Sequence, residues 1–300
     1  MTPDLPAAEL EAIFGSASPP EEVSDLRGKK FASTLGVWRV AAQGTSRILK
    51  QLALGAGENR TWPSEPEVLS THYWRREVEV YEHGLGVDIP FRLPSCSVFE
   101  RPDGSVALWL EDVGDPEPWP EEDIVDLARR LAAMPLVDDG PAWLARDWLP
   151  RYLELRAFRF DPELTYWRRR DEIVARIEAG PRVLVHNDFH PGNVFRPGGE
   201  PVVIDWAFAG LGVPGSDAGI LAGDFLFDGF YPPEEAQHLI DLIWDAYSGA
   251  LDPALVAGAE FTYFVGNALR YGWAPAFDEH FAAVYAALVS AAATRLPSFA

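Results

Sequence analysis

The chain changes character partway along its 300 residues. In residues 30–54, two runs rich in β-branched and aromatic residues, FASTLGVWRVAA and RILKQLAL, flank a QGTS turn and predict a strand pair. Residues 65–85 show helical spacing, and a second predicted hairpin, SCSVFE and VALWLED, surrounds the turn RPDG. After the proline-rich segment DPEPWP the pattern becomes mostly helical. This order predicts an α+β chain: a small lobe with an antiparallel sheet and one helix at residues 1–113, and a larger, mainly helical lobe at residues 114–300.

The helical pattern of the second lobe is interrupted once. Six helices are predicted, at residues 121–134, 143–158, 162–179, 233–247, 253–272 and 276–295. Between the third and the fourth, RVLVHND is typical of a short apolar strand that ends in a polar loop, and NVFRPGGEPVVIDW is typical of a hairpin with a PGGE turn. Catalytic groups are often carried by loops that a rigid scaffold holds in place. We therefore expect the functional site in this interruption.

The charge and composition exclude some classes of function. A formal net charge of -21 without a basic stripe argues against nucleic-acid binding, because a polyanion is bound through clustered Lys and Arg side chains. The same acidity would attract a cationic small molecule, although it also serves solubility. The longest apolar run, residues 281–293, is too short to span a membrane, and the amino terminus lacks the pattern of a signal peptide. Because Cys96 is the single cysteine, no internal disulfide can form, and a cytoplasmic protein is expected.

The interruption holds an unusual cluster of polar residues. The stretch LVHNDFHPGNVF, residues 184–195, contains two of the six histidines and two of the four asparagines of the chain. His186, Asp188 and Asn193 have the spacing H-x-D-x-x-x-x-N, and Asp205 follows the apolar run VVI. Phosphoryl transfer needs a carboxylate to orient the attacking hydroxyl and oxygen ligands for magnesium. Asp188 can be the carboxylate that orients the hydroxyl, and Asn193 with Asp205 can supply the oxygen ligands for magnesium.

A metal-dependent hydrolase is an alternative interpretation of the same stretch. His186, Asp188 and His190 form an H-x-D-x-H triplet of plausible metal ligands. The remaining histidines are scattered without paired spacing, so further ligands are lacking. This interpretation also gives no role to Asn193 or to the hairpin that follows it.

HNDFHPGN followed by VVIDWAFAG resembles the catalytic loop and metal-binding segment of the aminoglycoside phosphotransferase and choline kinase families, which have the protein-kinase-like fold. The resemblance assigns the catalytic site to Asp188 as catalytic aspartate, His186 as the residue that braces the loop, and His190 as either a contact to the moving phosphoryl group or a packing residue. It makes Asn193 and Asp205 the ligands of Mg²⁺. Trp206 and Ala207 stand where a protein kinase has Phe and Gly, which argues against a protein substrate.

The resemblance also implies a nucleotide-binding lysine on the third strand of the small lobe, where RILKQLAL offers Lys50. Only three residues of the chain are lysines, so Lys rather than Arg on this strand is notable, and a compact charge suits the α and β phosphates. A helical acid should pair with this lysine. Glu77 in YWRREVEVYEHGL is preferred over Glu79, because Glu77 flanks the presumed buried stripe of Trp74 and Val78.

Other nucleotide contacts are implied more loosely. Leu110, Glu111 and Val113, in LWLEDVGD, match the hinge whose backbone groups bind adenine. The loop that covers the phosphates is assigned to ASTLGVWRV, where Gly36 is the only glycine and Ser33 and Thr34 offer hydroxyl donors.

The resemblance gives less about the acceptor side of the site. Asp217 resembles the acid that braces the catalytic loop, and Asp224 and Asp228 can line a pocket for a cationic acceptor, although acids on a helix are usually solvated. Acceptor contacts are expected in residues 253–273, at Glu260, Tyr263, Asn267, Arg270 and Trp273.

The resulting expectation is a kinase that uses ATP or GTP with Mg²⁺ and phosphorylates a hydroxyl of a small, amine-bearing acceptor, such as an aminoglycoside, an amino sugar or a choline-like molecule. A kinase-fold protein that binds nucleotide without catalysis is the alternative, against which the complete set of Lys50, Asp188, Asn193 and Asp205 argues.

Overall fold

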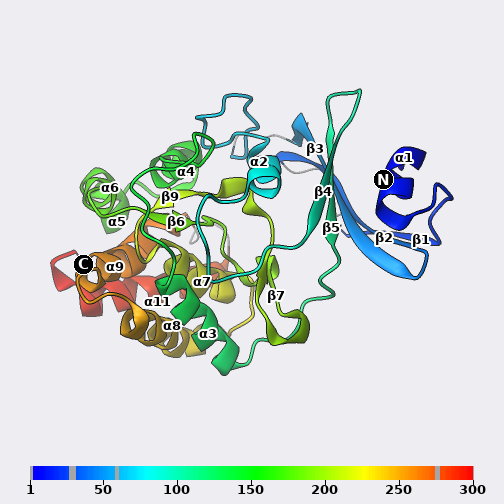
Figure 1. Cartoon of the computed structure of the whole chain (residues 1–300). Helices are drawn as coiled ribbons and strands as arrows, with labels where there is room; N and C mark the ends of the chain where they lie inside the picture. Colours follow the sequence, from blue (N-terminus) through cyan, green and yellow to red (C-terminus); the bar gives the residue numbers. More distant parts are fainter. Residues whose placement is uncertain (1–2, 27–31, 58–60, 274–277, 300) are drawn as a thin grey trace.

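The computed structural model of the chain describes residues 3–26, 32–57, 61–273 and 278–299. It has two lobes, one built on a twisted sheet and one built of helices, as the fold prediction required (Figure 1). The first residues of the predicted 30–54 and 276–295 segments lie outside the described residues.

The small lobe is a five-stranded antiparallel sheet with the strand order β1-β2-β3-β5-β4. Its predicted strands are present as β2 (Ala32–Ala42), β3 (Thr45–Gly57), β4 (Cys96–Glu100) and β5 (Val106–Glu111). The edge strand β1 (Glu22–Asp25) was not predicted, because four mostly polar residues carry little strand signal.

The two faces of the sheet are covered by different helices. In β5 the side chains of Ala107 and Trp109 pack toward α1 (Ala7–Phe14), and those of its alternate residues pack toward α2 (Arg76–His83). The prediction of one helix in this lobe was therefore wrong, because α1 covers the outer face (Figure 1). The same alternation in β3 places Leu49 on the α1 face and Lys50 on the α2 face.

The predicted helix at residues 65–85 was too long. It begins only at Arg76, and the preceding segment consists of turns in which the N–H of Glu65 donates to the carbonyl of His72 and the hydroxyl of Ser70 donates to the Glu65 carboxylate. Polar side chains that bond to nearby groups in this way compete with helix formation, and Pro66 cannot donate a backbone hydrogen bond. Sequence periodicity does not reveal that competition.

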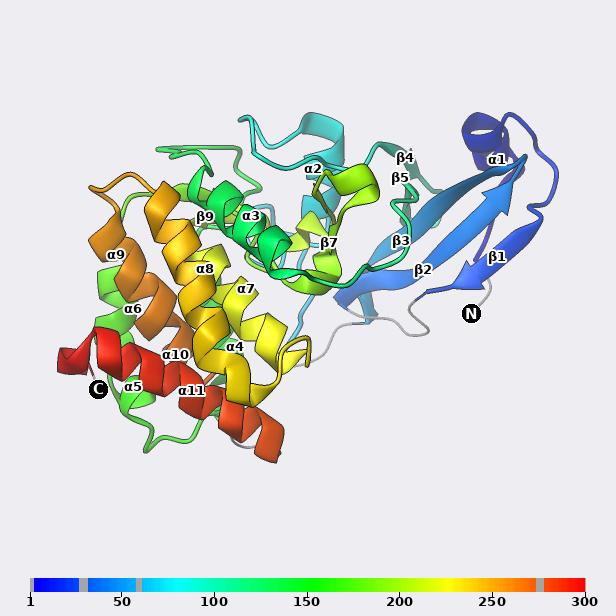
Figure 2. The same ribbon diagram turned by 90° about the horizontal axis from the view of Figure 1, so that it is seen from below.

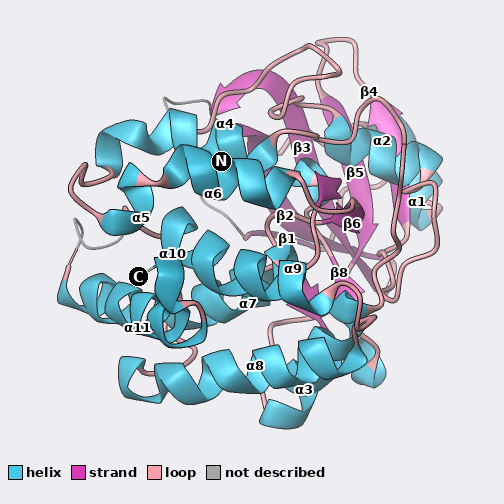
Figure 3. Cartoon of the chain, turned by 90° about the vertical axis from the view of Figure 1, so that its left-hand side faces the viewer, coloured by secondary structure: helices cyan, strands magenta, loops and turns pink. Residues whose placement is uncertain are grey.

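The large lobe is helical around one extended apolar core. Its helices are α3 (Glu121–Ala132), α4 (Trp148–Arg156), α5 (Thr165–Arg168), α6 (Arg170–Glu178), α7 (Ser216–Phe227), α8 (Ala236–Ala250), α9 (Val256–Phe261), α10 (Asn267–Arg270) and α11 (Glu279–Arg295). Helices α3, α7 and α8 pack against one another (Figure 2), and the helices gather at the end of the molecule away from the large sheet (Figure 3). None of the described helices is long and apolar enough to cross a membrane.

Two predicted helices are divided and one helix was missed. The 162–179 prediction is split into α5 and α6, and the 253–272 prediction into α9, a π-helical turn (Thr262–Gly266) and α10. Helix α7 is not among the six predicted helices. Its Gly219 and Gly223 lower helix propensity, but a Cβ there would press on Asn267 and, at 2.4 Å, on the ring of Tyr271. Close packing therefore explains these glycines.

The interruption of the helical lobe is present as predicted, in two small sheets. Strand β6 (Val183–Val185) pairs with β9 (Gly210–Gly212), and the hairpin consists of β7 (Val194–Phe195) and β8 (Val202–Val203). Short 3₁₀ turns, Pro191–Asn193 and Trp206–Phe208, stand just before β7 and between β8 and β9. The polar stretch therefore lies on loops between β6 and β9.

Candidate active site

A buried ion-pair network joins the two lobes at Lys50. Its Nζ lies 2.5 Å from Oε2 of Glu77 on α2 and 2.8 Å from Oδ1 of Asp205, which follows β8. Burial alone would lower the pKa of Lys50, but the carboxylates of Asp205 and Glu77 outweigh it and raise the pKa above its ordinary value. The predicted pairing of Lys50 with Glu77 is therefore present, and it brings Asp205 to the same place.

The alternative acid on α2 faces elsewhere. Glu79 accepts a hydrogen bond from the hydroxyl of Tyr73 at 3.0 Å and lies 3.5 Å from the exposed ring of His83. Glu77 is 2% exposed. The choice of Glu77 over Glu79 as the partner of Lys50 is confirmed.

Arg76, the neighbour of Glu77, anchors α2 to the helical lobe. Its guanidinium is completely buried and donates to the carbonyls of Trp143 at 2.6 Å, Thr71 at 2.8 Å and Ala207 at 3.0 Å, and also to Ser70 at 2.5 Å. Burial lowers the pKa of Arg76 to about 10, which leaves it charged at neutral pH. Sequence reasoning missed this residue because an arginine on an amphipathic helix is usually solvated.

The loop that follows β6, residues 186–193, is held in place by Asp217 at the start of α7. Its carboxylate accepts the backbone N–H groups of His186 at 2.7 Å and Asn187 at 2.9 Å. His186 is completely buried, its Nε2 contacts the carbonyl of Ile204 at 2.9 Å, and its Nδ1 accepts the N–H of Asp188 at 3.2 Å. Both ring nitrogens are thus engaged, so His186 positions the loop and does not reach a substrate.

Asp188 is the carboxylate that this loop presents. The side-chain amide of Asn193 donates to the Asp188 carbonyl at 3.0 Å and to its Oδ2 at 3.3 Å. The amide nitrogen is therefore committed to Asp188, and the amide oxygen is the atom with which Asn193 can hold a cation. Asp188 itself is partly exposed, so its carboxylate is accessible to a bound molecule.

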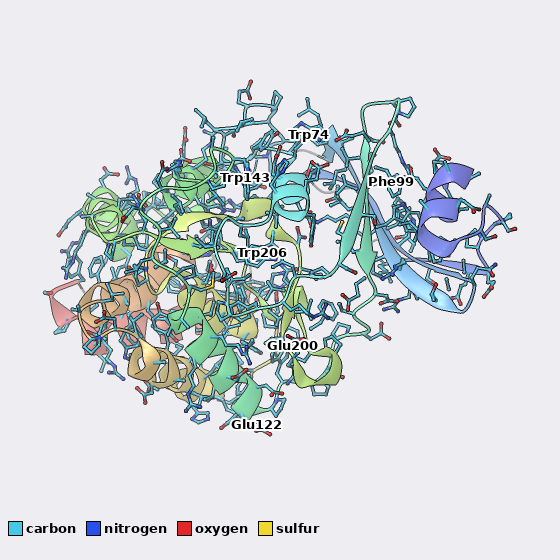
Figure 4. All side chains as sticks on the ribbon, in the orientation of Figure 1. Trp74, Phe99, Glu122, Trp143, Glu200 and Trp206 are labelled. Carbon is cyan, nitrogen blue, oxygen red and sulfur yellow. The ribbon has the colours of Figure 1, made fainter. Side chains whose placement is uncertain are left out.

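Asp205 adopts an unusual backbone conformation. Its φ is 59° and its ψ 55°, in the left-handed region that few residues other than glycine enter. The next residue, Trp206, is completely buried where the helical lobe meets the sheet-bearing lobe (Figure 4), and its Nε1 donates to the carbonyl of Val203 at 2.9 Å. The local strain turns the Asp205 carboxylate toward Lys50 and is of the kind found at functional sites.

His190 is surrounded by acids. Its Nδ1 faces the N–H of Gly192 at 3.1 Å and Oδ2 of Asp228 at 3.6 Å. A neutral ring would accept from Gly192, whereas a protonated ring would donate to Asp228. Burial lowers the pKa, but Asp228, Asp188 and Asp224 together raise it to about 9, so the ring is an imidazolium at neutral pH.

The residues assigned to the phosphate-covering loop lie elsewhere. Ser33, Thr34 and Gly36 are in strand β2, and Thr34 and Gly36 pair with Leu52 and Gln51 of β3. Gly36 is needed there because a Cβ would come within 2.3 Å of the Trp38 ring. The loop prediction was wrong for these residues. The connection from β1 to β2 includes residues 27–31, which lie outside the described residues.

The hinge prediction falls at the end of β5. Leu110 is buried and pairs with Ile48 of β3 and Cys96 of β4. The carboxylate of Glu111 is bound by Arg92 at 2.6 and 2.8 Å, so its side chain is not available to a nucleotide. An adenine could therefore be bound only by the backbone groups of Leu110, Glu111 and Val113.

Some of the predicted acceptor contacts serve packing instead. The hydroxyl of Tyr263 donates to the Ile240 carbonyl at 2.8 Å, and the amide of Asn267 donates to the Gly219 carbonyl at 2.5 Å, both inside the helical core. Glu260 is partly exposed on α9.

Two acids and one tryptophan of the expected acceptor side lie in one neighbourhood. The hydroxyl of Tyr271 donates to Asp224, and burial raises the pKa of Asp224 to about 6. The ring nitrogen of Trp273 donates to the hydroxyl of Tyr152 at 2.8 Å. Asp224 and Asp228 both act on the pKa of His190, which places them beside the loop of residues 186–193.

The metal-dependent hydrolase gains no support. Within residues 3–26, 32–57, 61–273 and 278–299, no three His, Cys, Asp or Glu side chains gather as metal ligands. A pocket of about 540 Å³ that is partly open to solvent is lined by α4, α6, β9 and α10, with Arg270 on its wall, and includes neither Lys50 nor Asp188.

Comparisons with known proteins agree with this geometry. The model of the phosphotransferase enzyme family (APH) matches residues 75–261. No curated protein matches the chain by sequence.

Solved structures share the fold. An amicoumacin kinase in complex with AMP-PNP, Ca²⁺ and Ami is 20% identical with a TM-score of 0.56, covering 92% of this chain and 89% of its own. A microcompartment-associated aminopropanol kinase is 15% identical with a TM-score of 0.56, covering 94% of each chain. A thermostable mutant of the aminoglycoside phosphotransferase APH(4)-Ia is 15% identical with a TM-score of 0.50, covering 97% and 99%. The predicted protein-kinase-like fold is thereby confirmed.

Proposed function

Since the family model spans more than half of its residues, this chain belongs to the phosphotransferase enzyme family, and from that membership we propose that it transfers the γ-phosphoryl group of ATP or GTP to a hydroxyl of a small molecule. One observation carries the proposal: Lys50 of the small lobe meets Glu77 and Asp205 in a buried network that adjoins the Asp188 loop. This arrangement matches the requirements of phosphoryl transfer, which are a lysine, a helical acid that holds it, a metal-binding acid and a base.

In this proposal Lys50 binds the phosphates of the nucleotide. Glu77 is almost wholly buried and keeps the Lys50 ammonium charged and fixed, while Asp205 holds it from the other side. The backbone of residues 110–113 accommodates the base. Two solved structures of this fold support ATP as the donor, because one is a complex with AMP-PNP and another, a mutant of APH(4)-Ia, is a ternary complex with ADP and hygromycin B.

The residues present fit a magnesium ion. The amide nitrogen of Asn193 is bonded to Asp188, which leaves its oxygen as a neutral hard ligand, and Asp205 offers a carboxylate. Magnesium bound by Asn193 and Asp205 would neutralise charge on the phosphates. Lys50 and the two ligands together fix where the triphosphate lies.

Asp188 orients the acceptor. Its carboxylate accepts the proton of the acceptor hydroxyl, the hydroxyl oxygen forms a bond to the γ-phosphorus, and the bond from that phosphorus to the bridging oxygen breaks to release the nucleoside diphosphate. The amide of Asn193 at 3.3 Å from Oδ2 holds the carboxylate in place. The base contributes on the order of 10² to 10⁴ in rate, and positioning supplies much of the rest.

We propose an amine-bearing alcohol as acceptor. Asp188, Asp224 and Asp228 gather around the catalytic loop, where they would attract an ammonium group. The similar structures include enzymes named for aminopropanol and for aminoglycosides, which is consistent with such an acceptor.

The test is consumption of ATP and GTP with Mg²⁺ across a panel of amine-bearing and neutral alcohols, with Asp188→Asn as the blank. Asn keeps the shape of Asp188 but cannot accept the proton, so turnover should fall by roughly 10² to 10⁴ while nucleotide affinity changes little. Equal turnover in both proteins would remove Asp188 from its role. Nucleotide binding without turnover on any alcohol would favour the non-catalytic alternative.

A further inference from the structure

Two arginines beside the catalytic loop have no use in the mechanism above. Arg156 is the last residue of α4 and Arg270 the last of α10. Arg156 is 4% exposed and Arg270 8%. Among the residues that the structure describes, neither guanidinium has a hydrogen bond or an ion pair, and Nη1 of Arg156 and Nε of Arg270 are buried without an acceptor. Buried arginines without acceptors are rare.

Aromatic rings hold both guanidinium groups in place. The guanidinium of Arg156 lies 4.1 Å from the ring centre of Trp62 and 3.9 Å from that of Tyr152. Arg270 lies 4.9 Å from the same Tyr152 ring and 4.4 Å from the ring of Trp148. The two cations therefore share the Tyr152 ring, which helps to fix their positions. Their hydrogen-bond donors stay unused.

Burying Arg156 without an acceptor is costly for the free protein. Burial, together with the neighbouring charge of Arg270, lowers the pKa of Arg156 to about 10, whereas the nearby Tyr271, Tyr152 and acids outweigh burial and raise the pKa of Arg270. The dipoles of the two helices favour a cation at each end, but they supply no hydrogen-bond acceptor. Arg76 shows the contrast, because its equally buried guanidinium is satisfied by backbone carbonyls. Two buried guanidinium groups left without acceptors indicate a group that arrives from outside.

The position of the pair indicates what that group is. Asp188 acts on the pKa of both arginines, and Asp224 acts on that of Arg270. Both arginines come from helices of the large lobe, whereas the nucleotide-binding Lys50 belongs to the sheet-bearing lobe. The pair therefore lies on the acceptor side of the catalytic aspartate.

We infer that Arg156 and Arg270 bind an oxyanion of the acceptor, a carboxylate or a phosphate, while its hydroxyl lies at Asp188. The inference rests on the proposed kinase function and narrows its acceptor. Asp224 and Asp228 would bind the ammonium group of the same acceptor. The inferred acceptor is therefore a zwitterionic amino alcohol. The planar fork of a guanidinium matches the two oxygens of a carboxylate, so two arginines on one ring form a fitting receptor.

Matched acceptors test the inference. Serine is compared with ethanolamine, and glycerate and glycerol 3-phosphate with glycerol, because one member of each comparison carries a carboxylate or a phosphate that the other lacks. The oxyanion-bearing member should have a kcat/KM about 10²-fold higher, and the better of glycerate and glycerol 3-phosphate identifies the anion. Turnover of ethanolamine or glycerol at equal or higher kcat/KM would overturn the inference and leave the kinase function standing.

Variants separate binding from a structural role. Arg156→Met should raise the KM of the oxyanion-bearing acceptor about 10²-fold without changing the KM of ATP, and should leave the melting temperature of the free protein equal or higher, since a costly buried charge is removed. Arg168→Met, at an exposed arginine of α5, is the matched control and should change neither. A lower melting temperature with an unchanged acceptor KM would show that Arg156 is structural.

A binding measurement covers the case in which no alcohol turns over. Glycerate, serine or inorganic phosphate at millimolar concentration should raise the melting temperature of the wild type and of Arg168→Met, but not of Arg156→Met. If none of these oxyanions stabilises the wild type more than Arg156→Met, the oxyanion site is overturned whatever the enzyme's activity.

Discussion

Arg76 offers the sharpest stability prediction, because its one guanidinium is hydrogen-bonded both to the helical lobe and to the turn that precedes α2. Arg76→Met keeps the length of the stem but removes every donor. The carbonyls of Trp143 and Thr71, 2.6 and 2.8 Å from the guanidinium, are buried and would lose their partner. The carbonyls of Ala207 and Ser70 are partly exposed and can turn to water.

The magnitude follows from these contacts. A buried acceptor left without a partner costs roughly 1–3 kcal/mol, so the two buried carbonyls together give about 4 kcal/mol of lost unfolding free energy. That is a large part of the roughly 5–15 kcal/mol by which domains are stable, and it should lower the melting temperature by roughly 10 °C. Because Arg76 precedes Glu77, the KM of ATP should rise as well.

The assay is urea denaturation of wild type, Arg76→Met and the matched control Arg75→Met. Arg75 is the adjacent arginine, but it pairs with Glu100 at the surface, so its loss should cost within about 1 kcal/mol. If Arg76→Met costs no more than Arg75→Met, the carbonyl contacts do not hold α2 in place, and the reasoning fails.

Three further predictions concern the catalytic loop and its metal. In Asp217→Asn, one of the two charged hydrogen bonds to the loop is lost, so the variant should lose about 1.5–3 kcal/mol of unfolding free energy, which denaturation measures. Steady-state kinetics should show that kcat falls more than KM changes. In His190→Gln, the alkaline fall of kcat/KM near pH 9 should disappear, because the raised pKa keeps the wild-type ring charged up to that pH. The stability that this charge gives is complete below about pH 6.5 and lost as the pH rises through about 9. Asp205→Asn should raise the Mg²⁺ concentration for half-maximal rate by at least about tenfold in a titration.

The sequence predicts much of the site because several independent patterns agree on it. Strand alternation places Lys50 on the face of β3 that α2 covers, and helical spacing turns Glu77 rather than Glu79 toward it. The hairpin with its PGGE turn then brings Asp205 to the same point. Each of these patterns is local in the sequence, and the pairing of Lys50 with a helical acid was implied by the resemblance to the kinase families.

The buried arginines show where such reasoning ends. Arg76, Arg156 and Arg270 all have the residue type that usually marks a solvated surface. What buries them is tertiary: backbone carbonyls from distant segments in the first case, and the rings of Trp62, Trp148 and Tyr152 in the others. For the same reason Gly36 was misplaced, because only the packed Trp38 ring explains it. Long-range packing has no signature in a single sequence.

The central claim is that Asp188 directs the γ-phosphoryl group to a hydroxyl of a small acceptor. The most direct measurement is ³¹P NMR of the reaction mixture with ATP, Mg²⁺ and the best acceptor, for wild type and Asp188→Asn. We predict a phosphomonoester signal that grows with that of ADP in the wild type and is absent over the same period in the variant. Release of inorganic phosphate without any phosphomonoester, or equal ester formation by both proteins, would contradict the claim.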